Sequence, residues 1–318
     1  MRLKLVPEDT HLNFIGHGRK FIVASLVAMV AALAVFLSQG LNFGVDFRGG
    51  ALIEIRTEGP ADLAQIRGIV GGLGLGDATV QEFGEPEEVL IQIAADAVVE
   101  GQPTPDEQVL RALKAELGEI ELRRVEFVGP KVSGELIQAG ILAVLLSLVA
   151  VMVYVWLRFE WQFAVGAVAS LAHDVLLTIG LFSLIQLEFN LSIVAALLTI
   201  VGYSLNDTVV VYDRVRENLR RYKAMPMLEL LNLSVNETLS RTMMTSITTL
   251  IALIALYTLG GEVIRGFTFG MIWGIVIGTY SSIFIAAMIV MLLGVKRDWS
   301  KPEDGGPAGV QFGAPDTP

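Results

Sequence analysis

The chain has 318 residues, of which 53% are hydrophobic, and its mean hydropathy is +0.61. So large an apolar excess excludes an ordinary soluble domain of this length and predicts an integral membrane protein. The formal net charge of −10, without any Lys/Arg-rich run, argues against nucleic-acid binding. The absence of cysteine excludes disulfides, thiol catalysis and thiolate metal sites, and no cofactor is expected.

Six apolar stretches meet or approach the ~20 residues that a membrane helix needs. The first follows Arg19 and Lys20 as a signal peptide would, but its apolar run is long and no clear A-x-A site follows, so a retained helix is predicted. The predicted fold class is therefore an α-helical integral membrane protein with six transmembrane helices. The stretches are residues 21–38, 136–157, 163–185, 191–212, 242–259 and 267–293.

Basic residues near the spans gather on one side of the membrane. They precede the first span, follow the second at Arg158, and recur after the fourth and sixth spans. Both termini are therefore predicted to be cytoplasmic. The predicted organisation is a cytoplasmic N-terminus (1–20), a first transmembrane helix (21–38), a periplasmic domain (39–135), a five-helix region (136–294) with a cytoplasmic amphipathic helix near 213–237, and a disordered cytoplasmic tail (295–318).

The outer segment, residues 39–135, contains eight basic and eighteen acidic residues, a difference equal to the net charge of the whole chain. Alternating β-branched and aromatic residues predict strands at 41–57, 78–83, 89–94 and 120–128. Helical periodicity predicts one helix after Pro60 and another after Thr104, where Glu107 would complete a capping box. The order β-α-β-β-α-β is that of an α+β ferredoxin-like domain.

Inside the third predicted span, Asp174 lies near the middle and shares a helical face with Ser170 and Thr178. Ionisable groups are costly in a span, so they mark ion paths or structural pairs. His173 points about 100° away from that face. It is interpreted as a packed or hydrogen-bonded core histidine, with a role in carrying protons as the alternative.

The fourth and fifth predicted spans carry two polar stripes that could face each other. Asp207, supported by Asn206, and Arg241, supported by Thr245, are the predicted proton pathway, in which a proton reaching Asp207 would release it from Arg241. The alternative is that Arg241 snorkels to the interface while Asp207 caps or pairs locally. The stripes comprise Thr199, Tyr203, Asn206 and Asp207 in the fourth span, and Thr238, Arg241, Thr242, Thr245, Thr248 and Thr249 in the fifth.

Glycine marks two further motifs. FGVDFRGG, residues 43–50, places Asp46 and Arg48 at the exit from the first span and then two glycines, Gly49 and Gly50, that permit unusual backbone angles. A simple turn before a strand would explain this run equally well. In the sixth span a small-xxx-small ladder predicts close approach of another helix. The ladder consists of Gly266, Gly270, Gly274 and Gly278.

Several motifs, in order along nearly the whole chain, resemble the SecF branch of the SecD/SecF family within the RND superfamily. The most characteristic is GYSLNDTVVVYDRVRENLR at 202–220. Met288 is a departure, because many relatives are expected to have proline there. The other motifs are FGVDFRGG (43–50), VGPKVSGEL (128–136), HDVLLTIG (173–180), NETLSRTMMTS (236–246) and GFTFGMIWGIVIGTYSSIFIAA (266–287).

The resemblance implies a subunit of the bacterial inner membrane that pairs with SecD to form an RND-type twelve-helix unit. Such a pair is expected to use the proton-motive force to help late steps of Sec-dependent export, after the SecYEG channel and SecA have moved the polypeptide. The resemblance also implies contact between the exported unfolded polypeptide and the periplasmic domain. It implies proton passage at Asp207 and Arg241, with Asp174 secondary.

Three other classes of function compete with this interpretation. A small-molecule exporter of the same superfamily would share the intramembrane carboxylates, but such pumps usually have larger outer domains and twelve spans in one chain. A non-transporting structural subunit would need only a static pair of Asp207 and Arg241. A membrane enzyme is disfavoured because the histidines, His11, His17 and His173, form no HExxH site and no GxSxG motif occurs.

Overall fold

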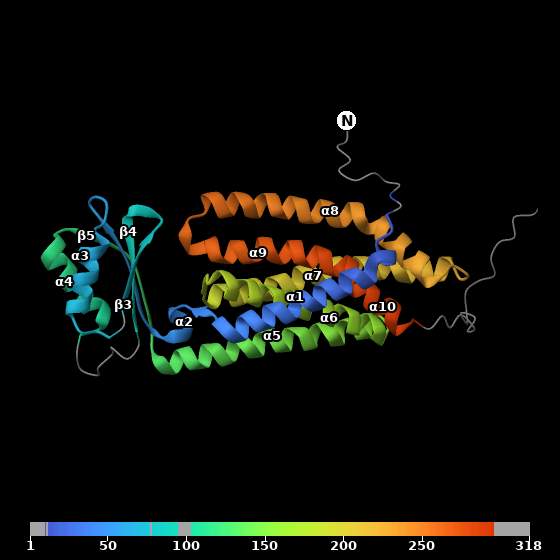
Figure 1. Ribbon diagram of the computed structural model, residues 1–318, viewed down its shortest axis with the longest axis horizontal. Helices are drawn as coiled ribbons and strands as arrows, with labels where there is room; N and C mark the ends of the chain where they lie inside the picture. The colour runs from blue at the N-terminus through green and yellow to red at the C-terminus, as the bar shows by residue number, and fades with distance from the viewer. Residues whose placement is uncertain (1–9, 11, 77, 95–102, 296–318) are drawn as a thin grey trace, which may run out of the picture.

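The computed structural model describes residues 10, 12–76, 78–94 and 103–295. A bundle of long helices makes up most of the molecule, and a small α/β domain lies at one end of it (Figure 1). The first long helix begins and the last one ends at the opposite end of the bundle (Figure 1). The outer domain therefore lies at the end of the bundle opposite the start of α1 and the end of α10.

Six helical segments among the described residues are long and apolar enough to cross a membrane, which confirms the predicted spans. The sixth segment is interrupted by one π-helical turn, η3, after which Met288 packs against Gly18 at the start of the first helix. The segments are α1 (Gly18–Gln39, preceded by the short η1, Ile15–His17), α5 (Pro130–Arg158), α6 (Trp161–Ile185), α7 (Leu191–Arg221), α8 (Met227–Leu259), and α9 (Glu262–Ser281) continued by η3 (Ser282–Ala286) and α10 (Ala287–Leu293).

The helices divide into central and peripheral ones. About half of the most apolar stretch is buried in α6, α7 and the sixth segment (50%, 50% and 56%), against 6% in α1, none in α5 and 11% in α8. A helix that is apolar on all sides but exposed in the isolated chain contacts lipid or another subunit. The centre formed by α6, α7 and α9 is therefore where buried polar chemistry can occur.

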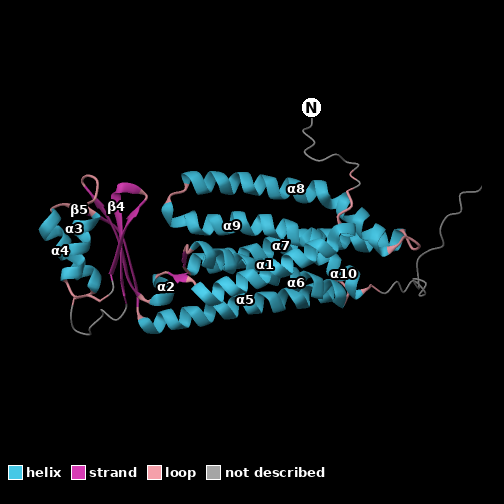
Figure 2. Cartoon of the chain, in the orientation of Figure 1, coloured by secondary structure: helices cyan, strands magenta, loops and turns pink. Residues whose placement is uncertain are grey.

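The outer domain has one four-stranded antiparallel sheet of order β3-β4-β2-β5 (Figure 2). Helices α3 and α4 cover one face, where Ile53, Ile66, Ile91 and Val109 are fully or almost fully buried. Asp62 caps α3 through its side chain, whereas Thr104 precedes α4 without a capping hydrogen bond. This is the predicted ferredoxin-like arrangement. Its elements are β2 (Gly50–Thr57), α3 (Leu63–Gly72), β3 (Ala78–Phe83), β4 (Glu85–Ala94), α4 (Pro105–Leu117) and β5 (Ile120–Val128).

The structure differs from the sequence-based prediction in two places. Residues 41–57 are not one strand: β1 (Asn42–Phe43) is followed by the short helix α2 (Val45–Arg48), and Gly49 and Gly50, with φ of 74° and 118°, turn the chain into β2. The amphipathic helix predicted near 213–237 does continue the fourth span, but it does not run to residue 237 as one helix. Helix α7 continues unbroken to Arg221, and α8 begins after Pro226. The charged pattern continued the helical period, and a proline favours a new helix start.

Three contacts join the outer domain to the loop between α6 and α7. Strand β1 pairs in parallel with β6 (Glu188–Phe189) in that loop. The Asp46 carboxylate accepts a hydrogen bond of 2.7 Å from the Leu191 backbone N–H at the start of α7. The Gln92 amide donates to Glu188 across 3.3 Å. The outer domain is thus attached directly to the helix that carries Asp207.

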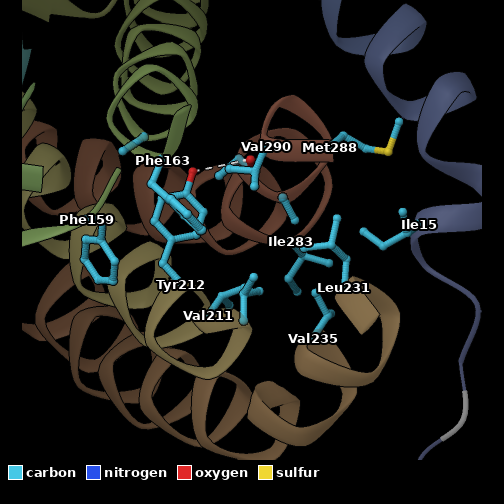
Figure 3. Packing of buried hydrophobic residues seen from close by; sticks show 14 of the residues in the cluster. Ile15, Phe159, Phe163, Val211, Tyr212, Leu231, Val235, Ile283, Met288 and Val290 are labelled. Atoms are coloured by element: carbon cyan, nitrogen blue, oxygen red, sulfur yellow. Dashed lines mark hydrogen bonds between the residues drawn. The ribbon is translucent and has the colours of Figure 1, made fainter. Parts of the chain in front are cut away.

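An aromatic cluster holds the helices together at the other end of the bundle. Tyr212 of α7 is fully buried, and its ring lies 4.9 Å from that of Phe163 and 6.0 Å from that of Phe159 (Figure 3). Its hydroxyl donates to the Ala286 carbonyl, 3.3 Å away. Contacts of this kind stabilise beyond their buried area. These contacts fix the relative positions of the helix ends that carry the neighbouring charged residues.

Candidate functional site

Asp174 of α6 is the centre of a buried polar network at the middle of the bundle. Its side chain is completely buried. One carboxylate oxygen accepts hydrogen bonds from the hydroxyls of Ser204 on α7, at 2.7 Å, and Ser281 on α9, at 2.8 Å. Ser170 extends the network by donating to Ser281 across 2.9 Å. Three helices therefore meet at one carboxylate.

His173 belongs to this network instead of pointing away from it. Its Nδ1 lies 2.9 Å from the other carboxylate oxygen of Asp174, and its side chain is 1% exposed. The helical wheel predicted a separation of about 100° between these neighbours, but side chains as long as these can turn toward each other. An imidazole and a carboxylate at hydrogen-bond distance can exchange a proton between them. The structure fits the interpretation as a packed, hydrogen-bonded core histidine, and the role in carrying protons stays a prediction.

Asp207 is also buried, at 2% exposure, but its surroundings are different. Its Oδ2 has no hydrogen-bond partner in the described part of the chain, and the same is true of the hydroxyls of Thr208 and Thr242. Asp207 lies about one helical turn, roughly 4.5 Å of rise, from the Ser204 that contacts Asp174. Buried polar atoms without partners are rare and concentrate at functional sites.

Arg241 lies close enough to Asp207 for an electrostatic interaction, but within the described residues no ion pair joins the two. Its side chain is exposed on the outside of the bundle, as is that of Asn206. Thr245 donates to carbonyls of its own helix. The two predicted stripes meet where the Tyr203 hydroxyl donates to Thr249 across 3.3 Å, but they do not enclose a path within this chain.

The glycine ladder of α9 packs on α7. A methyl group at Gly266, Gly270 or Gly278 would contact Ile193, Ala196 or Ser204, and at Gly274 it would overlap the side chain of Ile200. Small residues allow two helix backbones to approach closely. This close approach is what lets Ser204 of α7 and Ser281 of α9 reach the same carboxylate.

The FGVDFRGG motif has a positioning role in the fold. Asp46 binds the backbone of α7, whereas the Arg48 side chain is exposed. Gly44 lies against Glu188, where a Cβ would overlap the carboxylate. The motif therefore fixes how the outer domain meets the membrane helices.

Sequence reasoning missed Ser204 and Ser281, the two hydroxyl donors to Asp174. The available signal was their position: Ser204 precedes Asp207 by three residues, and Ser281 follows Gly278 by three, so each lies on the same helix face as a residue already singled out. Spacing within one helix does not reveal contacts between helices. Within the described residues no group of three or more acidic or histidine side chains could hold a metal ion.

Comparison with known proteins identifies the family. Residues 108–296 match the family model described as protein export membrane protein SecD/SecF, C-terminal, and residues 34–61 match the SecD/SecF GG motif. The chain belongs to the SecD/SecF family. It is 50% identical over 318 residues to the protein translocase subunit SecF of Cereibacter sphaeroides, covering 98% of both chains. It is 51% identical to the SecF subunit of Magnetococcus marinus, covering 92% of this chain and 94% of the relative.

A solved structure shows the same architecture. The crystal structure of SecDF, a translocon-associated membrane protein from Thermus thermophilus, superposes with a TM-score of 0.80 at 37% identity, and the match covers 91% of this chain. This chain spans 39% of the length of that larger chain. The protein is thus a multi-pass inner-membrane protein with a role in Sec-dependent translocation, a transport component and not a classical enzyme.

Proposed function

We propose that this SecD/SecF-family chain converts proton movement through the membrane into motion of its outer domain during late protein export. The observation that carries the proposal is the pair of buried carboxyl groups, Asp174 on α6 and Asp207 on α7, in a six-helix bundle. Ser204, which donates to Asp174, lies about one helical turn from Asp207. Ionisable groups so deep in a membrane protein are expensive unless they serve a path or a switch. Asp207 is the proposed proton acceptor, and Asp174 with His173 is its neighbour on the path.

A SecD-type partner completes this path. Asn206 and Thr199 on α7, and Arg241 and Thr248 on α8, are exposed on the outside of the bundle within helices long and apolar enough to cross a membrane. Polar and charged side chains at this depth face protein or water and not lipid. A second six-helix subunit against α7 and α8 would cover them and close an RND-type twelve-helix unit. The SecF relatives and the SecDF structure support SecD as this partner.

Helix α7 supplies the mechanical connection. It carries Asp207, and its first residue, Leu191, is bound by Asp46 of the segment that leads into the outer domain. Strand β6, just before α7, pairs with β1 of the same segment. A shift of α7 when Asp207 gains a proton and its interaction with Arg241 weakens would therefore reach the outer domain. There the exported polypeptide would be held, after SecYEG and SecA have passed it across.

The energy available per proton fits a switch better than an unfolding machine. One charge crossing 100 mV releases ~2.3 kcal/mol. This is enough to shift a two-state equilibrium by more than tenfold, but well below the free energy of unfolding of a typical domain. Repeated cycles would be needed. The positive-inside rule supports an orientation in which the start of α1 and the end of α10 face the cytoplasm and the outer domain faces the opposite side.

The test compares export into inverted membrane vesicles with and without a proton gradient. We expect Asp207→Asn to abolish the gain that the gradient gives, and Asp174→Asn to reduce it at least tenfold, at equal membrane levels of the SecD complex. Glu229→Gln, an exposed carboxylate at the start of α8, is the control and should export normally. Full gradient-dependent export by Asp207→Asn would favour a structural subunit. Loss of small-molecule extrusion with intact export would favour an exporter.

A further inference from the structure

A basic cleft lies at the end of the bundle opposite the outer domain, where α5 ends beside α7. Its volume is about 430 Å³. The residues from α7 recur at intervals of three and four, so they share one face of that helix. Four guanidinium groups against two carboxylates give the cleft a formal charge of +2. The lining consists of Arg158 from α5 and Asp213, Arg216, Glu217, Arg220 and Arg221 from α7.

Both carboxylates of the cleft already have partners. Asp213 binds the guanidinium of Arg158 at 3.0 Å, and Glu217 binds that of Arg214, a residue outside the cleft, at 2.7 Å. Arg216 and Arg220, in contrast, form no ion pair with any described residue. The planar guanidinium fork matches phosphate oxygens in a bidentate manner. The cleft therefore presents two adjacent donors that lack an anion.

The cleft lies at the depth of lipid headgroups. From Leu191, α7 rises about 33 Å to Asp213, which is slightly more than the ~30 Å of a hydrocarbon layer. Trp156 and Trp161 flank Arg158 and are 61% and 51% exposed. Exposed tryptophans are typical of the boundary between hydrocarbon and headgroups. The aromatic cluster around Tyr212 holds α5, α6 and α7 together just beside this boundary.

An apolar surface leads from this boundary along α5 toward the outer domain. The side chains on it are between 39% and 57% exposed, and nothing in the described chain covers them. A molecule with its anionic group among the arginines would therefore place its apolar part on this surface. A free phosphate or a soluble acidic protein would leave that surface unused. The surface consists of Leu142, Leu145, Leu146, Val149, Met152 and Val153.

We propose that the cleft binds the headgroup of an anionic phospholipid, with its phosphodiester between Arg216 and Arg220 and its acyl chains along α5. A zwitterionic lipid is disfavoured because its ammonium group would face a positively charged cleft. The bound lipid joins the ends of α5 and α7. At their other ends α5 follows β5 directly and α7 is bound by Asp46, so the lipid braces the two helices that hold the outer domain.

The test uses the full chain purified in detergent and titrated with phosphatidylglycerol, with bound lipid counted by native mass spectrometry. We expect the double variant Arg216→Gln/Arg220→Gln to bind phosphatidylglycerol at least tenfold more weakly, since each arginine contributes several-fold near a membrane surface. The matched control is Arg19→Gln/Lys20→Gln, which removes the same charge from two exposed residues at the start of α1. It should bind within twofold of the unaltered chain.

Further arms separate the sources of the anion. Arg216→Lys/Arg220→Lys keeps the positive charge but removes the bidentate guanidinium geometry, so it should bind phosphatidylglycerol with an intermediate affinity. Phosphatidylcholine should bind equally to all forms, and inorganic phosphate at millimolar concentration should not displace phosphatidylglycerol. Equal loss in the control and in the arginine variant would overturn the proposal, because it would show diffuse attraction. The proposal would also be overturned if the double variant bound phosphatidylglycerol as well as the parent and had an unchanged thermal midpoint. Displacement of the lipid by free phosphate would overturn it too.

Discussion

The two buried aspartates of the bundle differ in almost every respect except depth. Asp174 lies between three helices, and its two oxygens together have three hydrogen-bonding partners, Ser204, Ser281 and His173. Asp207 lies on α7, one turn from Ser204, and one of its oxygens has no hydrogen-bonding partner among the described residues. Both oxygens of the first carboxylate are hydrogen-bonded within this chain, although Nε2 of His173 has no partner among the described residues. Under the proposed function, another subunit that covers α7 and α8 would complete the second site.

This difference separates structural from switching roles. A fully hydrogen-bonded carboxylate holds helices in one arrangement, because every alternative loses bonds that water does not replace. A carboxylate with an unused oxygen loses much less when it changes protonation or position. We therefore expect Asp174 to dominate the stability of the fold and Asp207 to dominate its function. The expectations below follow this order, from the largest effect on stability to the smallest.

Asp174→Ala should be the most destabilising of these substitutions. It leaves His173 and two serine hydroxyls buried without their acceptor, and each buried polar group left without a hydrogen-bond partner typically costs about 1–3 kcal/mol. The midpoint of thermal unfolding in a mild detergent measures the effect. Asp174→Asn, which keeps an oxygen acceptor, should recover part of the loss. A midpoint for Asp174→Ala equal to that of the parent would show that the network does not hold the bundle.

Gly274→Ala tests how the network is assembled. The added methyl group would overlap Ile200 and push α9 away from α7, at a cost of about 1–3 kcal/mol. Gly202→Ala is the matched control, because open space surrounds that glycine and alanine favours the helix. The same unfolding measurement applies to both. If both variants unfold at the same temperature, close packing of the ladder does not position Ser281.

Asp207→Asn should change the free energy of unfolding by no more than about 1 kcal/mol, because the substitution breaks no ion pair. Its gradient-dependent export should nevertheless be lost. Both the free energy of unfolding and the gradient-dependent export are measured on this one variant. If both fall strongly, the distinction between the two aspartates fails. Strong destabilisation would mean that Asp207 is structural like Asp174, and the two sites would no longer differ.

Glu188 gives the smallest effect, and one that depends on pH. Burial and the nearby Asp46 raise the pKa of Glu188 above its ordinary value of 4.5, although Gln92 acts in the opposite direction. A carboxyl group whose pKa is raised in the folded state stabilises that state when protonated. This contribution is complete below about pH 4.5 and is lost as pH rises through the folded pKa.

Glu188→Gln cannot ionise, so it should not lose stability as the pH rises. Its thermal midpoint should therefore exceed that of the parent at pH 7 but not at pH 4. Midpoints measured across this range test the expectation. Glu85→Gln, an exposed carboxylate of the same domain, is the control and should run parallel to the parent. A gain for Glu188→Gln that is equal at both pH values would mean that titration of Glu188 does not weaken the attachment.

Much of the architecture is local enough to be predicted from sequence. The strands at 78–83 and 120–128 match β3 and β5 residue for residue, because alternation with period two needs only a few positions to show. The six spans follow from length and hydropathy. The strand predicted at 41–57 was wrong, because two glycines with positive φ break it in a way that composition does not reveal.

The candidate site was predictable in its carboxylates but not in their partners. Asp174 and Asp207 stand out in the sequence because a charge in an apolar span is expensive wherever it points. Whether that charge is hydrogen-bonded depends on serines 30 and 107 residues away, brought within reach by the close contact of α9 on α7. Burial cost belongs to one residue and its helix, so sequence shows it. Hydrogen bonding belongs to the approach of several helices, so only their packing settles it.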